Sequence, residues 1–422
     1  MAGKKQPSSR GGGAAKSTNP TSSRTSSRNQ KPGPQRTATQ TTEKVESEEE
    51  LRRQQTLLNV FSNTFREVLE AEDFSSQLQE LKTALFNRDF EGAFAREAAL
   101  DVYAARWSPT RALCYGQVLH GLDSHLKGLV RDHSPHGAVD KDAPSHGDQD
   151  ENAETKPKES EASTTATEQE DSEGKEKIQP LRILAIGGAA AEIVAFADYI
   201  SSHDNTSSTT PPRAEVTLFD IGPWGSIVQR LHAALTSTPP ISRYASAAAR
   251  EANKALVALE SLQSSFVQKD ILSLDQADLA ALISGRGEQP MLITLLFTLN
   301  ELYTTSGIKR TTSFLRLLSA LAPRDTLLLV IDSPGSYSEA AVGREAKRYP
   351  MQWLLDHTLV PPAPNPRKPG DGREDGGQGP DVRWEKIESH DSVWFRVAEG
   401  LRYPIPLENM RYQMHLYRAS IG

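Results

Sequence analysis

The chain has one cysteine among its 422 residues, Cys114, and this scarcity excludes an intrachain disulfide and any zinc site built on several thiolates. Such low cysteine use is typical of a protein from a reducing compartment. The sequence has no apolar run long enough to span a bilayer, and its N-terminus lacks the apolar stretch of a secretory signal. We therefore expect neither a membrane protein nor a secreted one.

Acids are absent from the first 42 residues, which carry Lys and Arg among Ser, Thr, Gly and Pro. This composition predicts a disordered basic tail over residues 1–47. Composition also predicts a helical region over 48–131, a disordered acidic linker over 132–178, and a larger domain over 179–422 with a disordered Pro/Gly-rich insert at about 361–380. The formal net charge of -7 is the sum of a basic tail and an acidic linker, whose charges partly cancel. The net charge is therefore compatible with nucleic-acid binding but is not evidence for it.

Apolar strand-like runs alternate with helical patterns through the larger domain. We expect strands at 181–186, 214–220, 266–270, 291–297 and 326–332, with helices between them. This alternation predicts an α/β fold with a doubly wound parallel sheet, which binds ligands outside the carboxyl ends of its strands. A helix over 344–357 follows, and then two strand-like runs, 384–394 and 410–418, which no helix separates. An antiparallel terminal pair is expected there.

A glycine pair follows the first expected strand in LRILAIGGAAAEIVAF. Gly187 and Gly188 allow a sharp turn and a close approach of the backbone to a ligand. A helix beginning near Ala189 and carrying Glu192 would point free N–H groups at that ligand. The full G-x-G-x-x-G spacing of a dinucleotide site is absent, because alanines follow the pair. A tight turn without a ligand is the alternative.

Two acids end the second and third expected strands. Asp220 is the type of residue that binds both hydroxyls of a ribose. Asp270 is placed to accept a hydrogen bond from the exocyclic amine of an adenine. Together they fit S-adenosylmethionine, although each aspartate alone is equally compatible with a turn at a strand end.

Two terminal strands with no helix between them are typical of class I S-adenosylmethionine methyltransferases, whose last strand inserts into the sheet. Longer motifs carry a more specific resemblance: RALCYGQVLHGL (111–122), LAIGGAAAE (184–192), ASAAAREANK (245–254), FTLNELYTTS (297–306), IDSPGSYSE (331–339) and RYPMQWLLDHTL (348–359). With these motifs the chain resembles the fungal 25S rRNA uridine-N3 methyltransferases. The resemblance runs from about Leu51 to the C-terminus, apart from the acidic and Pro/Gly-rich segments. A third glycine, usual in the wider superfamily, is missing from this loop.

The resemblance implies methyl transfer from S-adenosylmethionine to ring nitrogen N3 of a uridine in large-subunit rRNA, without a metal. It further implies 25S rRNA or a pre-60S particle as partner and no membrane. The basic tail fits a nuclear or nucleolar address, with the cytoplasm as an additional location. In the loop after the fourth strand, Phe297 would border the cofactor, Asn300 would read the uracil edge and Glu301 would accept the N3 proton. Solvent is the alternative base, and Glu301 is equally a residue that suits a helix start.

RNA contacts are predicted at Arg344, Lys347 and Arg348, on the helical stretch expected there, and at Tyr303 as a stacking side chain. Trp224, Tyr337 and Trp353 are further stacking candidates, and a solvated charged face or an aromatic core is the alternative for each set. A second hypothesis is a methyltransferase fold retained as an inactive RNA-binding protein of ribosome assembly. A methyltransferase acting on a protein or small molecule is the third.

Overall fold

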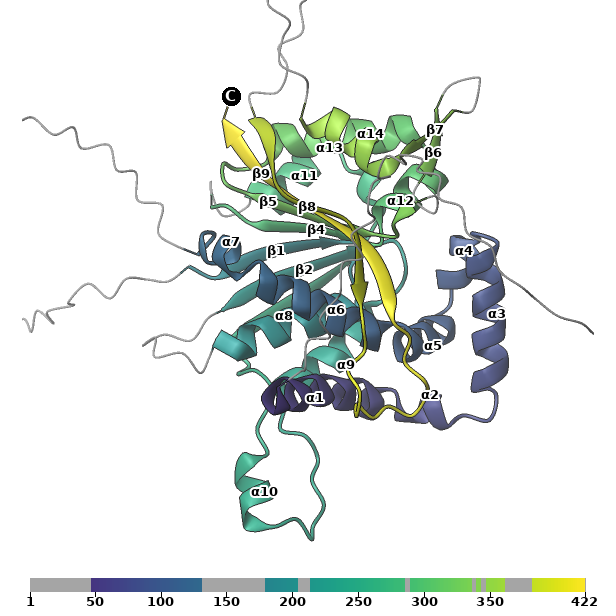
Figure 1. The fold of residues 1–422 in the computed structure, drawn as a ribbon, viewed down its shortest axis with the longest axis vertical. Coiled ribbons are helices and arrows are strands. Elements are labelled where there is room, and N and C mark those ends of the chain that lie inside the picture. Colours follow the sequence, from purple (N-terminus) through teal and green to yellow (C-terminus); the bar gives the residue numbers. More distant parts are fainter. Residues whose placement is uncertain are drawn as a thin grey trace, which may run out of the picture. The chain divides into compact units, whose positions relative to one another are not determined.

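The computed structural model describes residues 47–130, 179–203, 213–284, 289–335, 339–342, 347–360 and 382–421. These residues all belong to one compact unit, residues 46–422 (Figure 1). The predicted basic tail, the acidic linker and the Pro/Gly-rich insert lie outside the described residues. Within the described part of the chain, no helix is both long and apolar enough to cross a membrane.

A seven-stranded sheet in the order β3-β2-β1-β4-β5-β9-β8 forms the centre of this unit (Figure 1). Its strands are β1 (Leu181–Ile186), β2 (Ala214–Asp220), β3 (Leu262–Gln268), β4 (Leu292–Leu296), β5 (Leu327–Asp332), β8 (Val382–Phe395) and β9 (Met410–Ile421). The first five run parallel, whereas β9 is antiparallel to both β5 and β8. The predicted doubly wound α/β fold with an antiparallel terminal pair is confirmed.

Apolar cores cover both faces of the sheet, which explains why β1, β4 and β5 are buried along their whole length. Successive residues of β1 point to opposite faces, so Ile183 enters one core and Leu184 the other. The first core includes helices α8 (Ala190–His203) and α9 (Gly225–Thr236), and the second includes α11 (Gln276–Ser284), α13 (Ile308–Leu321) and α14 (Met351–Leu359).

Seven helices, α1 to α7, precede the sheet in the described residues. They are α1 (Glu48–Thr64), α2 (Arg66–Glu70), α3 (Phe74–Phe86), α4 (Phe90–Phe94), α5 (Glu97–Arg106), α6 (Ser108–Gly121) and α7 (Asp123–Lys127). Helix α6 packs against α8, and its apolar residues share the first core. The N-terminal helices are therefore part of the same packed body as the sheet.

The prediction of a helix over 344–357 is wrong for its first half. Residues Lys347–Pro350 form β7, which pairs antiparallel with β6 (Glu339–Val342), and the helix α14 begins only at Met351. Pro350 explains the boundary, because a proline disfavours helical geometry in the residue before it but suits the start of a helix. Between β2 and β3 lie the helices α9 and α10 (Ala247–Ala252).

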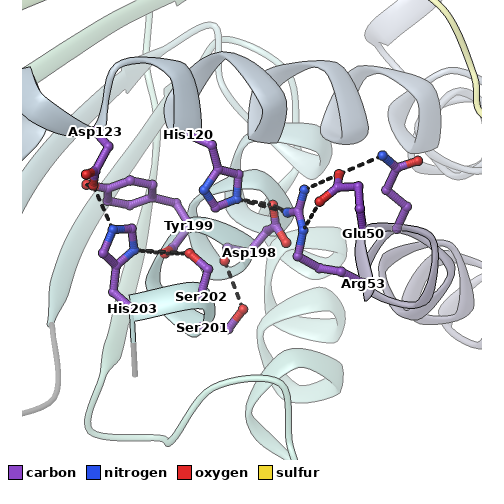
Figure 2. A network of polar contacts seen from close by, with 10 residues as sticks. Glu50, Arg53, His120, Asp123, Asp198, Tyr199, Ser201, Ser202 and His203 are labelled. Carbon is purple, nitrogen blue, oxygen red and sulfur yellow. Dashed lines mark hydrogen bonds and ion pairs between the residues drawn. The ribbon is translucent and has the colours of Figure 1, made fainter. Parts of the chain in front are cut away.

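A polar network fastens α1 and α6 to α8 (Figure 2). Arg53 of α1 forms an ion pair with Asp198 of α8, whose side chain is completely buried. The same carboxylate lies 3.1 Å from Nε2 of His120 at the end of α6. Glu50 accepts hydrogen bonds from Arg53, including one of 3.0 Å from its Nε. This network, Glu50–Arg53–His120–Asp198, is called the Arg53 network below.

The loop between β8 and β9 returns to the N-terminal helices. The backbone of Arg402 and the side chain of Gln55 exchange two hydrogen bonds, of 2.8 and 2.9 Å. The hydroxyl of Tyr403 donates to the carbonyl oxygen of Ala105 at 2.7 Å. Glu408 forms an ion pair with Arg106. The first and last parts of the described unit are thus joined directly.

Candidate active site

A cavity of about 800 Å³ opens at the carboxyl edge of the parallel strands. One wall comes from the turn after β1 and from the ends of β2, β3 and β4, and the other from α4, α5 and α6. This position is where doubly wound sheets bind ligands, and the volume lies within the range of small-molecule sites.

The glycine turn between β1 and α8 forms the floor of the cavity. Gly187 has a φ of +70°, and a Cβ there would collide with the side chain of Thr298. A Cβ on Gly188 would come within 2.6 Å of the Cβ of Ala185, so close packing requires both glycines. Gly187 and Ala189 border the cavity, whereas Gly188 lies behind it and shapes the turn.

Glu192 closes the turn from within α8. Its Oε2 accepts a hydrogen bond from the backbone N–H of Ala189 at 2.9 Å, as a carboxylate at a helix start commonly does. Burial raises the pKa of Glu192 to about 7, despite the backbone hydrogen bonds that oppose this. Glu192 therefore borders the cavity and also holds the loop in shape.

Asp220 and Asp270 both reach the cavity wall, as their positions at strand ends predict. Oδ1 of Asp220 accepts from the N–H of Gly222 at 2.7 Å, and burial raises the pKa of this carboxyl to about 6. The Asp270 carboxylate accepts from Leu272 N–H at 2.9 Å and pairs with Arg310 at 3.2 Å. Asp270 thus has the turn-forming role that was its alternative interpretation.

The segment after β4 supplies Phe297 and Glu301 to the cavity but not Asn300. Phe297 has a φ of +61°, which is rare for a residue with a side chain and marks a strained site. Burial, reinforced by the negative charge of Asp220, raises the pKa of Glu301 to about 7. Asn300 is held at its backbone, where its N–H donates to the buried carboxylate of Asp332 at 2.9 Å.

The predicted RNA-contacting residues are dispersed. Tyr303 has only 2% of its surface exposed, because its side chain packs in the second core. Its ring therefore cannot stack on an RNA base. Lys347 and Arg348 lie on strand β7 and not on the predicted helix, because Pro350 shifts the start of that helix to the next residue. Arg344 and Tyr337 lie outside the described residues. Trp353 is exposed but stacks between Tyr349 and His357.

Sequence reasoning missed the wall contributed by the N-terminal helices. Phe94, Tyr103 and Arg111 come from α4, α5 and α6, and Trp224 packs against the rings of Phe94 and Tyr103. Arg111 donates a hydrogen bond to the hydroxyl of Tyr103, and its guanidinium lies 4.7 Å from the ring centroid of Phe297. The only signal for it in the sequence is that it opens the motif RALCYGQVLHGL.

The donor set fits an adenosyl cofactor and gives no sign of a metal centre. A strand-end carboxylate, a bare backbone turn and an aromatic wall are the features that hold a nucleoside. Among the described residues, no group of three or more His, Cys, Asp or Glu side chains is arranged to hold a metal ion.

Fold and cavity together define a class I methyltransferase architecture. A protein-family profile described as "Putative SAM-dependent methyltransferase" matches residues 61–418, so the chain belongs to this family and its cofactor is S-adenosylmethionine. The chain is 29% identical over 384 residues to the 25S rRNA (uridine(2843)-N(3))-methyltransferase of Saccharomyces cerevisiae, with 86% of this chain and 85% of that protein covered.

Solved structures with a similar fold are more remote. An O-methyltransferase family protein from Burkholderia thailandensis aligns with 84% of this chain and 74% of its own, at 9% identity and a TM-score of 0.31. A SAM-dependent methyltransferase from Methanosarcina mazei aligns with 57% of this chain and 92% of its own, at 10% identity and a TM-score of 0.28. The assignment therefore rests on the family profile and on the strand order.

Proposed function

We propose that the protein methylates N3 of a uridine in large-subunit ribosomal RNA, with S-adenosylmethionine as methyl donor. The observation that carries this proposal is the similarity to the yeast rRNA uridine-N3 methyltransferase, which spans nearly the whole of both chains. The family profile covers both walls of the cavity, since its match begins at residue 61 in α1.

The reaction needs a proton acceptor, because N3 of uridine carries a proton at neutral pH. Glu301 borders the cavity beside Phe297, and a carboxyl whose pKa is about 7 suits a base at that pH. In this mechanism Glu301 would take the N3 proton and then release it to solvent, while N3 would receive the methyl group from the sulfur of the bound cofactor.

Orientation is the second task of the site. The bound cofactor supplies a methyl group already activated by the sulfonium charge, so the protein has to align donor and acceptor and exclude water. Gly187, Ala189 and Asp220 would hold the adenosyl part, and Asp270 and Glu192 would complete its surroundings. Asn300 does not border the cavity, so we assign it no contact with the uracil; its backbone N–H instead joins this segment to Asp332.

The RNA is proposed to lie across the mouth of the cavity. Strand β7, with Lys347 and Arg348, follows β5 in the chain, and β5 is the neighbour of β4, whose following segment lines the cavity. Its cations, with Arg344, would contact phosphates. A pre-60S particle as substrate and a nucleolar location follow from this choice of RNA.

The test is methylation of deproteinised large-subunit rRNA with purified protein and isotope-labelled S-adenosylmethionine, followed by nuclease digestion and mass spectrometry of the nucleosides. We expect labelled 3-methyluridine, and a 10²- to 10⁴-fold lower rate for Glu301→Gln, the usual range for a lost general base. Glu97→Gln is the matched control, since Glu97 is exposed on α5 outside the cavity and its loss should leave the rate unchanged. Cofactor binding without any 3-methyluridine would refute the proposed substrate.

A further inference from the structure

Arg111 is a cation in the cavity wall, where Glu192 and Glu301 attract it electrostatically but neither forms an ion pair with it. Its guanidinium donates a hydrogen bond to the hydroxyl of Tyr103 and lies over two rings, 4.7 Å from the centroid of Phe297 and 5.4 Å from that of Tyr103. Among the described residues it forms no ion pair, unlike Arg53 and Arg106 of the N-terminal helices and Arg230 of α9. A guanidinium withdrawn from bulk water normally has an anionic partner, so this one is positioned for an anion from outside the chain.

The other cation of the wall is already neutralised. Lys269 borders the cavity but forms an ion pair of 2.7 Å with Asp278. The remaining charged residues that border it in the described part of the chain are acids, Glu91, Glu192, Asp220, Asp270 and Glu301. These acids favour cationic ligand groups, such as a sulfonium or an ammonium, and Arg111 alone is suited to a negative group.

The position of Arg111 along the sheet edge indicates which ligand group it meets. Asp220 ends β2, Gly187 follows β1 and Phe297 follows β4, and these strands are adjacent in that order. Two strand spacings separate β2 from β4, on the order of 10 Å. A ligand with its ribose at Asp220 that crosses the glycine turn therefore brings its opposite end under Arg111.

We propose that Arg111 is a positioning residue that binds the α-carboxylate of the methionine part of S-adenosylmethionine. That carboxylate is the single anionic group of the cofactor, and a planar guanidinium binds it through two parallel hydrogen bonds. The ring of Phe297 lies under the guanidinium and keeps it flat against the wall. This inference rests on the cofactor of the family and is independent of the RNA substrate.

One structural consequence is that the N-terminal helices complete the cofactor site. Arg111 lies in the first turn of α6, whereas the turn that holds the adenosyl part belongs to β1 and α8. Helix α6 packs against α8, so the two halves of the site are in direct contact.

The test measures binding of two ligands by calorimetry on the full chain: S-adenosylhomocysteine, and its decarboxylated analogue, which keeps the adenosine, the thioether and the amine. For the wild type we expect the analogue to bind about 10- to 100-fold more weakly, the size of one charge-assisted contact. For Arg111→Met we expect the two ligands to bind about equally, because the group that distinguishes them has lost its partner. Arg111→Lys should retain part of the difference.

Arg230→Met serves as the control, because Arg230 also lies over an aromatic ring but pairs with Asp101 away from the cavity. It should keep the full difference between the ligands. Equal affinity of both ligands for the wild type would overturn the proposal without any variant. A ligand difference that persists in Arg111→Met, with a lower methylation rate, would overturn it in favour of a contact to the uracil anion.

Discussion

Two arginines reach from the N-terminal helices toward the α/β core, and their surroundings are opposite. Arg53 meets a completely buried carboxylate, Asp198, and a second carboxylate, Glu50, on its own helix (Figure 2). Arg111 meets a phenol and two aromatic faces at the edge of a cavity. We assign Arg53, which forms an ion pair, to the stability of the helix assembly, and Arg111, which forms none in the described part of the chain, to ligand binding.

Helix α6 takes part in both arrangements. His120 near its C-terminal end contacts Asp198, whereas Arg111 in its first turn borders the cavity. The Arg53 network therefore fixes the helix that presents Arg111. Stability and cofactor binding are assigned to different ends of one helix, and substitutions can separate them.

Breaking the Arg53 network should have the largest effect on stability. Arg53→Met leaves the buried Asp198 carboxylate without its main partner, and removal of one member of a buried pair costs about 3 kcal/mol or more in free energy of unfolding. The measurement is urea unfolding followed by circular dichroism. Arg52→Met is the matched control, because the Arg52–Glu48 pair is exposed and should contribute nothing measurable. Equal stabilities of the two variants would contradict this account.

Gly187→Ala should damage the site from the opposite wall. The added methyl group meets Thr298 and the residue is strained at a φ of +70°, so we expect a loss of about 2 kcal/mol in stability and at least about 10-fold in cofactor affinity. Gly400→Ala has a similar φ of +88° but nothing within 4 Å of the new atom. It should show only the smaller strain cost, with unchanged affinity. Calorimetry and thermal unfolding distinguish the two.

Arg111→Met should change the stability of the ligand-free protein by less than about 1 kcal/mol. The apolar side chain removes a desolvation cost and breaks no ion pair, but it also removes the attraction between the guanidinium and the Glu192 carboxylate. Thermal unfolding without ligand measures the change. A destabilisation as large as that of Arg53→Met would show that Arg111 stabilises the folded state. The two arginines would then not differ in role.

The smallest effect expected is a pH dependence of opposite sign in the two regions. Burial raises the pKa of Glu192 and of Glu301 to about 7, so the folded protein holds protons that the unfolded chain releases between about pH 4.5 and 7. Their contribution to stability therefore falls as pH rises through this window. Glu301→Gln should flatten that slope in urea unfolding at pH 5.5, 6.5 and 7.5.

In the Arg53 network the sign is reversed. Burial acts to raise the pKa of Glu50, but hydrogen bonds from Arg53 and Gln54 outweigh it and hold this pKa below its usual value. The stability that Glu50 contributes is present above its ordinary pKa and is lost as the pH falls through the lowered one. Arg53→Met should therefore make the free energy of unfolding fall less steeply as the pH is lowered into the acid range. The slope of this free energy against pH near neutrality should stay unchanged.

The sheet was predictable because its strands are continuous apolar runs bounded by clear breaks. Leu181–Ile186 and Leu327–Asp332 are buried on both faces, and no helical periodicity competes with that pattern. The same holds for the glycine turn and for Asp220, which lie next to a strand in sequence as well as in space. Local sequence was sufficient wherever the site is made by one strand and the turn after it.

Contacts between distant segments were not predictable in this way. Helix α5 has little amphipathic pattern, because Leu100, Val102, Ala104 and Ala105 are all buried and only packing by other segments makes the helix stable. Arg111 reaches Phe297 across a separation in sequence that no periodicity encodes. The error at β7 has a different origin, since there a helical pattern was extended through Pro350 toward its N-terminal side.

The contact between Gln55 and Arg402 has a consequence for synthesis of the protein. The two residues are 347 positions apart, and at typical elongation rates the ribosome needs on the order of half a minute to proceed from one to the other. During that interval α1 and α5 lack the hydrogen bonds and the ion pair that the last loop supplies. A nascent chain thus cannot complete these contacts before its final segment has been made, and the finished enzyme forms only after translation has passed this loop.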